Sequence, residues 1–184
     1  VYDAPLVFFC QNNQWAISEP TERQSRLPLY QRARGYGFPG IRVDGNDVLA
    51  CLAVTRWALE ECRQGNGPVL IEAFTYRMDA HTTTDDPSRY RLSDELEEWK
   101  LKDPIERVRA YLTREARVAP EFFKDVEKES KALAEHVRSG CRALPNPSPE
   151  SVFDNVHVDM PDDLREQRAE FAQFVASIQE EVPA

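Results

Sequence analysis

The chain has 184 residues, enough for one domain or for a domain with an appendage. Apolar residues make up 41% and charged residues 30%, a balance typical of a globular protein with a hydrophobic core and a charged surface. The formal net charge of −9 argues against a nucleic-acid partner, and no apolar stretch approaches the ~20 residues that a membrane-spanning helix needs.

The first apolar run ends in two adjacent asparagines. Residues 6–10 are continuously apolar, which predicts a strand buried on both faces of a parallel sheet. Ligands of such sheets bind just beyond the carboxyl ends of the strands. Asn12 and Asn13 stand there, and their neutral oxygens suit a hard cation such as Mg²⁺. The alternative is that both are turn residues, because asparagine tolerates left-handed backbone and caps helices.

The following segment, residues 19–40, is polar and interrupted by prolines and glycines. It predicts a loop with a short helix around Leu29–Arg34, and its arginines face either an anionic ligand or solvent. Three regular elements follow: a strand at 41–44, a helix at 48–64 capped by Asn46 or Asp47, and a strand at 68–74. This order predicts the α/β class, as part of an open, mostly parallel sheet with flanking helices.

The second informative stretch is residues 77–91, RMDAHTTTDDPSRYR. It has neither helical nor strand periodicity and directly follows a strand, so it predicts a loop at the carboxyl edge of the sheet. His81 stands alone in it, followed by Thr82 and two further threonines. A histidine in such a loop is either a catalytic group or an ordinary surface residue.

From Ser93 onward the pattern predicts a helical C-terminal extension. Helices are expected at 93–99, 103–112, 120–138 and from Pro161 onward; Ser93 and Asp103 are the expected caps, Gly140 the expected stop, and 144–149 a proline-rich linker. We therefore divide the chain into an α/β part at 1–92, a helical region at 93–143, and a linker with a docking helix at 144–184.

The four cysteines show no spacing typical of a metal site. Cys10, Cys51, Cys62 and Cys141 form no Cys-x-x-Cys pair, which argues against zinc. We expect them to be buried, reduced thiols of a cytoplasmic protein. The sequence has no initiator methionine and opens almost directly into a strand, so we also expect it to be part of a longer chain.

Several of these stretches resemble one family. FFCQNNQWAIS, RVDGND, GPVLIEAFTYR and the His81 loop are similar to the α-subunits of thiamin-diphosphate-dependent 2-oxo acid dehydrogenases. The tail from Asn146 resembles the branched-chain type. In this family the cofactor motif opens with Gly-Asp-Gly, which is absent here. The chain therefore resembles the C-terminal half of an α-subunit, with part of the thiamin-diphosphate-binding fold.

The resemblance implies cofactors, roles and partners. It implies thiamin diphosphate and Mg²⁺, with Asn13 ligating the metal through its side-chain oxygen and Trp15 through its backbone carbonyl. His81 is the implied catalytic residue beside the diphosphate, and Thr82 occupies the place of a hydroxyl that a kinase phosphorylates in mitochondrial enzymes. The implied cofactor-binding residues are Asn13, Gln14, Trp15, Ala16, Ile17 and His81.

The implied reaction is oxidative decarboxylation of a 2-oxo acid, with acyl transfer to a lipoyl group of a transacylase. The implied assembly is α2β2, in which the C-terminal helix docks on the β-subunit, and the chain alone is expected to be inactive. Two alternatives stay open: the α-subunit of a pyruvate dehydrogenase, and a non-catalytic α/β module with a structural or partner-binding role.

Overall fold

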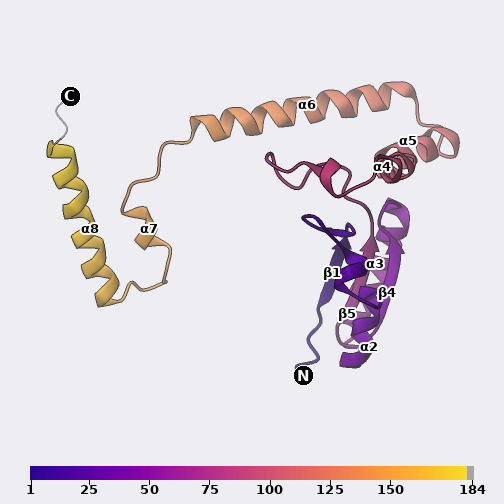
Figure 1. The fold of residues 1–184 in the computed structure, drawn as a ribbon, viewed down its shortest axis with the longest axis horizontal. Helices are drawn as coiled ribbons and strands as arrows, with labels where there is room; N and C mark the ends of the chain where they lie inside the picture. Colours follow the sequence, from indigo (N-terminus) through magenta and orange to yellow (C-terminus); the bar gives the residue numbers. More distant parts are fainter. Residues whose placement is uncertain (182–184) are drawn as a thin grey trace. The chain divides into compact units, whose positions relative to one another are not determined.

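The structure is a computed structural model that describes residues 1–181. It contains two compact units, one from Val1 to Ala119 and the other beginning at Pro120. The first unit holds every strand of the described chain, whereas the second is helical (Figure 1). The predicted class, an α/β part followed by a helical extension, is confirmed.

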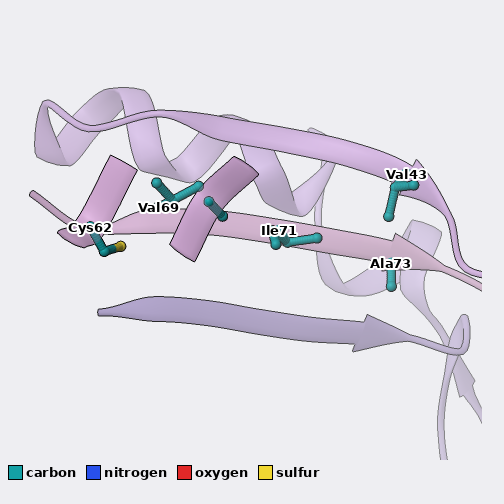
Figure 2. Packing of buried hydrophobic residues seen from close by; sticks show 6 residues of the cluster. Val43, Cys62, Val69, Ile71 and Ala73 are labelled. Atoms are coloured by element: carbon teal, nitrogen blue, oxygen red, sulfur yellow. The ribbon is translucent and has the colours of Figure 1, made fainter. Parts of the chain in front are cut away.

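Three parallel strands form the sheet of the first unit. They are β1 (Val7–Asn12), β4 (Gly40–Asp44) and β5 (Val69–Phe74). The sheet order is β1-β5-β4, so the last strand in the sequence lies in the middle (Figures 1 and 2). Asn12 and Asp44 both pair with Phe74, so the carboxyl ends of all three strands meet at one edge. The predicted parallel sheet and its strands are confirmed.

One face of this sheet packs against the helix α3 (Val48–Arg63), whose predicted range is also confirmed. Asp47, not Asn46, is the cap: its side chain accepts hydrogen bonds from the amides of Leu49 and Ala50 at 3.0 Å. The core between helix and sheet is formed by small and branched side chains (Figure 2): Val43, Ala58, Cys62, Val69, Ile71 and Ala73.

The opposite face lies under the segment that connects β1 to β4. Side chains alternate along a strand, so the face away from α3 carries Asn12, Arg42, Glu72 and Phe74. The segment includes a two-residue ribbon of β2 (Trp15–Ala16) with β3 (Glu19–Pro20), then α1 (Thr21–Gln24), the 3₁₀ turn η1 (Leu29–Gln31) and α2 (Arg32–Tyr36). The last two elements confirm the predicted short helix; the ribbon and α1 were not predicted.

The expectation that the first strand is buried on both faces is wrong for the described chain. β1 is an edge strand that pairs only with β5, and it continues through Asn12 instead of ending at Cys10. Phe9 is 50% exposed because α3 packs mainly on β4 and β5, which leaves the Phe9 side of β1 open. Phe8 is 45% exposed on the opposite face of the sheet, where it pairs with Leu70 and stacks on Phe38. A continuous apolar run indicates that a strand is suited to burial on both faces. The position of the strand in the sheet determines whether other elements pack on those faces.

Two further helices complete the first unit, α4 (Ser93–Lys100) and α5 (Pro104–Arg114). Asp103 caps α5 as predicted and accepts hydrogen bonds from the amides of Ile105 and Glu106 at 2.8 and 3.0 Å. The predicted cap of α4 is wrong. Ser93 is already the first helical residue and Leu92 precedes it, so the serine hydroxyl has no position from which to accept a first-turn amide.

The second unit consists of α6 (Pro120–Ala143), α7 (Ser151–Asp154) and α8 (Asp162–Glu181). The predicted stop at Gly140 is wrong, since α6 continues to Ala143. One glycine costs a helix only about 1 kcal/mol, whereas Pro145 restricts the residue before it to extended backbone. The segment between α6 and α7 contains no helix or strand, as predicted for a proline-rich linker.

The environments of the cysteines differ from the uniform burial expected. Cys62 is buried, Cys10 and Cys51 are partly buried, and Cys141 on α6 is exposed. All four are free thiols. Cys141 is exposed because the described part of α6 has no buried face. Across residues 1–181, no helix combines the length and apolar character needed to cross a bilayer.

Candidate functional site

The asparagine pair forms a turn at the carboxyl end of β1. Asn12 is buried, with 6% of its surface exposed. Its Oδ1 accepts a hydrogen bond from the Gln14 amide at 3.0 Å and another from the Thr21 hydroxyl at 3.2 Å. Its Nδ2 donates to Oε1 of Glu72 at 2.7 Å. Asn12 therefore connects the turn, the start of α1 and the central strand.

Asn13 makes a second turn of the same kind. Its Oδ1 accepts a hydrogen bond from the Trp15 amide at 3.0 Å. Two overlapping side-chain-to-backbone turns of this type fix the local backbone, with Gln14 at φ +70° and Ile17 at φ +55°. The turn role expected for the pair is confirmed as local structure. A carbonyl oxygen has two lone pairs, so Oδ1 of Asn13 retains one for a ligand.

The turn is also fastened to the end of β5. The Thr75 amide donates to the Asn12 carbonyl at 2.9 Å, and the Arg77 amide donates to the Asn13 carbonyl at 3.2 Å. The Gln14 side chain donates to the Thr75 carbonyl at 2.8 Å. These bonds extend the pairing of β1 with β5 by two residues and bring the two informative stretches of the sequence together.

The His81 loop is held by a carboxylate rather than by apolar contacts. Oδ2 of Asp85 accepts hydrogen bonds from the His81 amide at 2.8 Å and from the Tyr90 hydroxyl at 2.6 Å. His81 and Thr82 are exposed, and the Thr82 hydroxyl lies 3.2 Å from that of Thr84. Within residues 1–181 the His81 imidazole has no recorded hydrogen bond or ion pair. The loop is irregular as predicted, apart from the 3₁₀ turn η2 (Pro87–Arg89).

Arg77 joins this loop to the asparagine turn. One nitrogen of its guanidinium donates to the Ile17 carbonyl at 2.6 Å and to the Tyr90 hydroxyl at 2.9 Å. The Tyr90 ring also packs on the Trp15 indole, with centroids 5.4 Å apart. A continuous set of contacts therefore runs from Ile17 through Arg77 and Tyr90 to Asp85, whose carboxylate fixes the His81 backbone.

A cavity of about 580 Å³ opens on the sheet face opposite α3. Asn12, Gln14 and Trp15 line it, as do Glu72 and Arg42. The other residues expected to bind the cofactor do not line it. The structure thus brings Gln14 and Trp15 to the cavity, whereas the remaining candidates lie elsewhere on the turn and loop: Asn13, Ala16, Ile17 and His81.

Charge and burial shift several pKa values around the turn and loop. The hydrogen bond from Tyr90, then that from the His81 amide, lower the pKa of Asp85 below that of an ordinary carboxyl group. Burial, then the adjacent Asp85, raise the pKa of Tyr90. Burial, then the charge of Glu72, raise the pKa of the Cys10 thiol. Asp85 is therefore an anion and the Tyr90 phenol is neutral at neutral pH, as their hydrogen bond requires.

The oxygens at the turn fit one part of a Mg²⁺ site. Trp15 pairs with Pro20, which has no N–H, and the bond from the Thr21 amide to the Gln14 carbonyl flanks that pair. The Trp15 carbonyl is therefore directed away from β3 and is not used by the ribbon. Asn13 and Trp15 offer oxygen atoms, the type of ligand that Mg²⁺ takes. Among the described residues, no group of three or more His, Cys, Asp or Glu forms a metal site of the kind that zinc requires.

The arginines of residues 19–40 mostly face solvent. Arg23 pairs with Glu19 at 3.7 Å with its side chain 76% exposed, and Arg34 is exposed on α2. Of this group only Arg26 lines the cavity. The solvent-facing alternative therefore describes most of the cluster.

Three residues of the site were not predicted from the sequence: Glu72, Arg77 and Tyr90. One signal was available for Glu72, because a charged residue inside an apolar strand must be paired. For Arg77 and Tyr90 the sequence carries no comparable signal, since both lie in a polar loop.

Comparisons with known proteins agree with the resemblance. The profile of the family "Dehydrogenase E1 component" matches residues 1–150. The 3-methyl-2-oxobutanoate dehydrogenase subunit alpha of Mycobacterium tuberculosis is 46% identical over 181 residues, which are 96% of this chain and 48% of that protein. The mitochondrial 2-oxoisovalerate dehydrogenase subunit alpha of Homo sapiens is 39% identical over 98% of this chain and 41% of its own length.

A relative with another substrate in its name also matches. The pyruvate dehydrogenase E1 component subunit alpha of Acholeplasma laidlawii is 38% identical over 96% of this chain and 52% of that protein. The chain thus spans about half the length of the curated relatives that it matches.

Proposed function

The chain belongs to the dehydrogenase E1 component family, and on that premise we propose that it forms part of the cofactor site of a branched-chain 2-oxo acid dehydrogenase α-subunit. It is a homologue of these α-subunits at about half their length. The observation that carries the proposal is the pair of overlapping asparagine turns at the carboxyl edge of the sheet, in contact with the loop that bears His81.

In this proposal Asn13 and Trp15 supply two oxygen ligands to Mg²⁺. The geometry of the turn supports it, because one lone pair of Asn13 Oδ1 and the Trp15 carbonyl are left over by the local hydrogen bonds. The bound cofactor is proposed to lie along the turn, in contact with Gln14, Ala16 and Ile17. His81 is proposed to contact its diphosphate. Thiamin diphosphate, when bound, supplies the nucleophilic carbon and the electron sink for decarboxylation.

The loop has a second task in the proposal, which is to present His81 during acyl transfer to a lipoyl group. The Asp85 carboxylate fixes the backbone of His81 and leaves its imidazole exposed for a partner. Thr82, beside it, is the proposed place of regulation, because a phosphate there adds about −1.5 to −2 charges next to a diphosphate.

The helical part is proposed to bind a β-subunit in an α2β2 enzyme that works with a lipoyl-bearing transacylase. Phe174 and Ile178 lie on the apolar stripe of α8 and are 59% and 46% exposed. We retain the division into 1–92, 93–143 and 144–184, in which the last part docks on the β-subunit. A cytoplasmic location is proposed from the cysteine pattern.

The substrate is proposed to be a branched 2-oxo acid, because identity is 46% to a 3-methyl-2-oxobutanoate enzyme and 38% to a pyruvate enzyme. The test uses a full-length α-subunit carrying this segment, assembled with its β-subunit. Decarboxylation is assayed with an artificial electron acceptor on 3-methyl-2-oxobutanoate and on pyruvate. A larger kcat/KM on pyruvate refutes the substrate assignment, and no thiamin-dependent activity on either substrate refutes the enzyme.

A further inference from the structure

We propose that Glu72 is a positioning residue: through Asn12 it holds the asparagine turn in the conformation that offers Asn13 and Trp15 to a metal ion. The inference rests on the function proposed above and deepens it. It assigns a task to a buried carboxylate that has no part in the scheme above.

Glu72 is fully buried in the middle of the central strand. Among the residues that the structure describes, it is the only charged side chain with so little exposure. It lies on the sheet face away from α3, where it reaches the cavity beside the turn. A buried carboxylate is destabilising unless it is paired and hydrogen-bonded, so its partners indicate what it is for.

Two hydrogen-bond donors and one cation, from three different segments, converge on this carboxylate. Oε1 accepts from Asn12 Nδ2 at 2.7 Å and lies 3.8 Å from Arg42 Nε, and Oε2 accepts from the Tyr30 amide at 3.0 Å. Arg42 also stacks on the Phe74 ring at 3.7 Å. An amide in place of the carboxylate offers one acceptor oxygen, so it cannot accept from both donors, and it carries no charge to pair with Arg42.

The hydrogen-bond partners of Asn12 determine which side of its amide group holds the oxygen and which holds the nitrogen. Its Oδ1 must accept from the Gln14 amide, because a backbone N–H only donates. Nδ2 is therefore turned toward Glu72, and the side chain cannot flip without placing two donors against each other. Glu72 thus sets the rotamer of Asn12, which in turn sets the backbone of Gln14 at φ +70°. The Trp15 amide and the Asn13 oxygen follow directly in the chain.

The test is Glu72→Gln in the full-length α-subunit assembled with its β-subunit. Calorimetry measures the Kd of thiamin diphosphate and the Mg²⁺ concentration at half-saturation. We expect both to rise by tenfold or more, which corresponds to a loss of about 1.4 kcal/mol of binding free energy. Arg42 is left without its carboxylate, but its side chain is 36% exposed and reaches water, so no buried charge is stranded.

Ile71→Val is the matched control for a purely structural effect. Ile71 is adjacent to Glu72 on β5, is fully buried on the other face of the sheet, and does not line the cavity. We expect it to lower Tm by a few degrees and to leave both binding constants within twofold of the wild type. If Ile71→Val weakens the cofactor as much as Glu72→Gln at equal loss of Tm, Glu72 has no positioning role.

The second variant reverses the direction of the hydrogen bond between residues 12 and 72, so that residue 72 donates and residue 12 accepts. In Asn12→Asp with Glu72→Gln, Gln at 72 donates to Asp at 12 and accepts from the Tyr30 amide. The other oxygen of Asp at 12 still accepts from Gln14 and Thr21. The charge of the cluster is unchanged. We expect this pair to restore cofactor affinity to within about threefold of the wild type, also where Glu72→Gln alone does not assemble.

The outcomes separate this inference from the function on which it rests. If the wild-type enzyme shows no Mg²⁺-dependent binding of thiamin diphosphate, the proposed function fails. If the wild type binds and Glu72→Gln binds equally well, only the positioning role fails. If the double variant binds no better than Glu72→Gln, the hydrogen-bond polarity argued here is wrong and the inference is overturned.

Discussion

The Arg77 guanidinium makes the side-chain hydrogen bonds that join the asparagine turn to the His81 loop, so its removal should loosen both segments. Its guanidinium donates to the Ile17 carbonyl at 2.6 Å and to the Tyr90 hydroxyl at 2.9 Å. Ile17 is a β-branched residue at φ +55°, a backbone conformation that such residues rarely adopt. The bond from Arg77 to its carbonyl is therefore one of the contacts that hold a strained residue in place. We predict that Arg77→Met releases it.

The expected destabilisation of the turn follows from two opposing free energies: the backbone strain at Ile17 and the hydrogen bond from Arg77 that offsets it. Backbone strain of this kind costs about 1–3 kcal/mol and persists only where the surroundings impose it. A hydrogen bond from a charged donor contributes about 1.5–3 kcal/mol, and less at a site as exposed as Ile17, which is 55% accessible. We therefore expect Arg77→Met to weaken the ordered conformation of residues 13–18 by about 1–2 kcal/mol, a factor of about 5–30 in its population.

Limited proteolysis of the assembled full-length enzyme measures this directly. Arg77→Met should speed cleavage in residues 13–18 and in the His81 loop together, and should weaken cofactor affinity by a similar factor. Arg89→Met is the matched control, because Arg89 lies in the same loop and its exposed side chain makes no recorded hydrogen bond or ion pair with residues 1–181. Equal cleavage rates in the two variants, or faster cleavage in the loop alone, would refute the coupling.

Three further predictions concern individual groups of the site. Asn13→Ala should abolish most of the Mg²⁺-dependent cofactor affinity, whereas Asn12→Ala should act mainly by lowering Tm. Calorimetry and thermal unfolding of both variants check this, and equal losses of affinity and of Tm in the two variants contradict the metal assignment. His81→Ala should slow acylation of the lipoyl domain more than binding of the 2-oxo acid, and Thr82→Glu should do the same by repelling the diphosphate; wild-type acylation in both variants would return His81 to a surface role. The pKa of Asp85 is lowered in the folded state, so its contribution to loop order is present above the ordinary carboxyl pKa and is lost as pH falls through the lowered value. The protection factor of the His81 amide, which is the intrinsic exchange rate at each pH divided by the observed rate, should therefore fall between about pH 5 and 2.5, roughly the carboxyl range, and a constant protection factor contradicts the role of Asp85.

Much of the fold is determined locally and was therefore predictable. The apolar runs at β4 and β5 and the periodic helix α3 are read from one element at a time. Asp103 caps its helix because the side chain and the amides it accepts are at most three residues apart. The asparagine turn belongs to the same class, since each side chain bonds an amide two residues ahead.

Two predictions were wrong for different reasons, one tertiary and one local. The run at residues 6–10 has the composition of a buried strand, but its position at the edge of the sheet leaves Phe8 and Phe9 half exposed. Gly140 has the composition of a helix stop, yet α6 continues past it because the cost of one glycine is small.

The sequence by itself determined which residues stand at the carboxyl ends of the strands: the asparagine pair after one and the histidine loop after another. Only the tertiary structure decided that β5 lies next to β1, and this places Glu72 against Asn12 across 60 residues of chain. It also decided that Arg77 reaches back to Ile17, likewise 60 residues away. The physical reason is that strand order is set by the packing of whole elements, and no periodicity within one segment reports which segment will lie beside it.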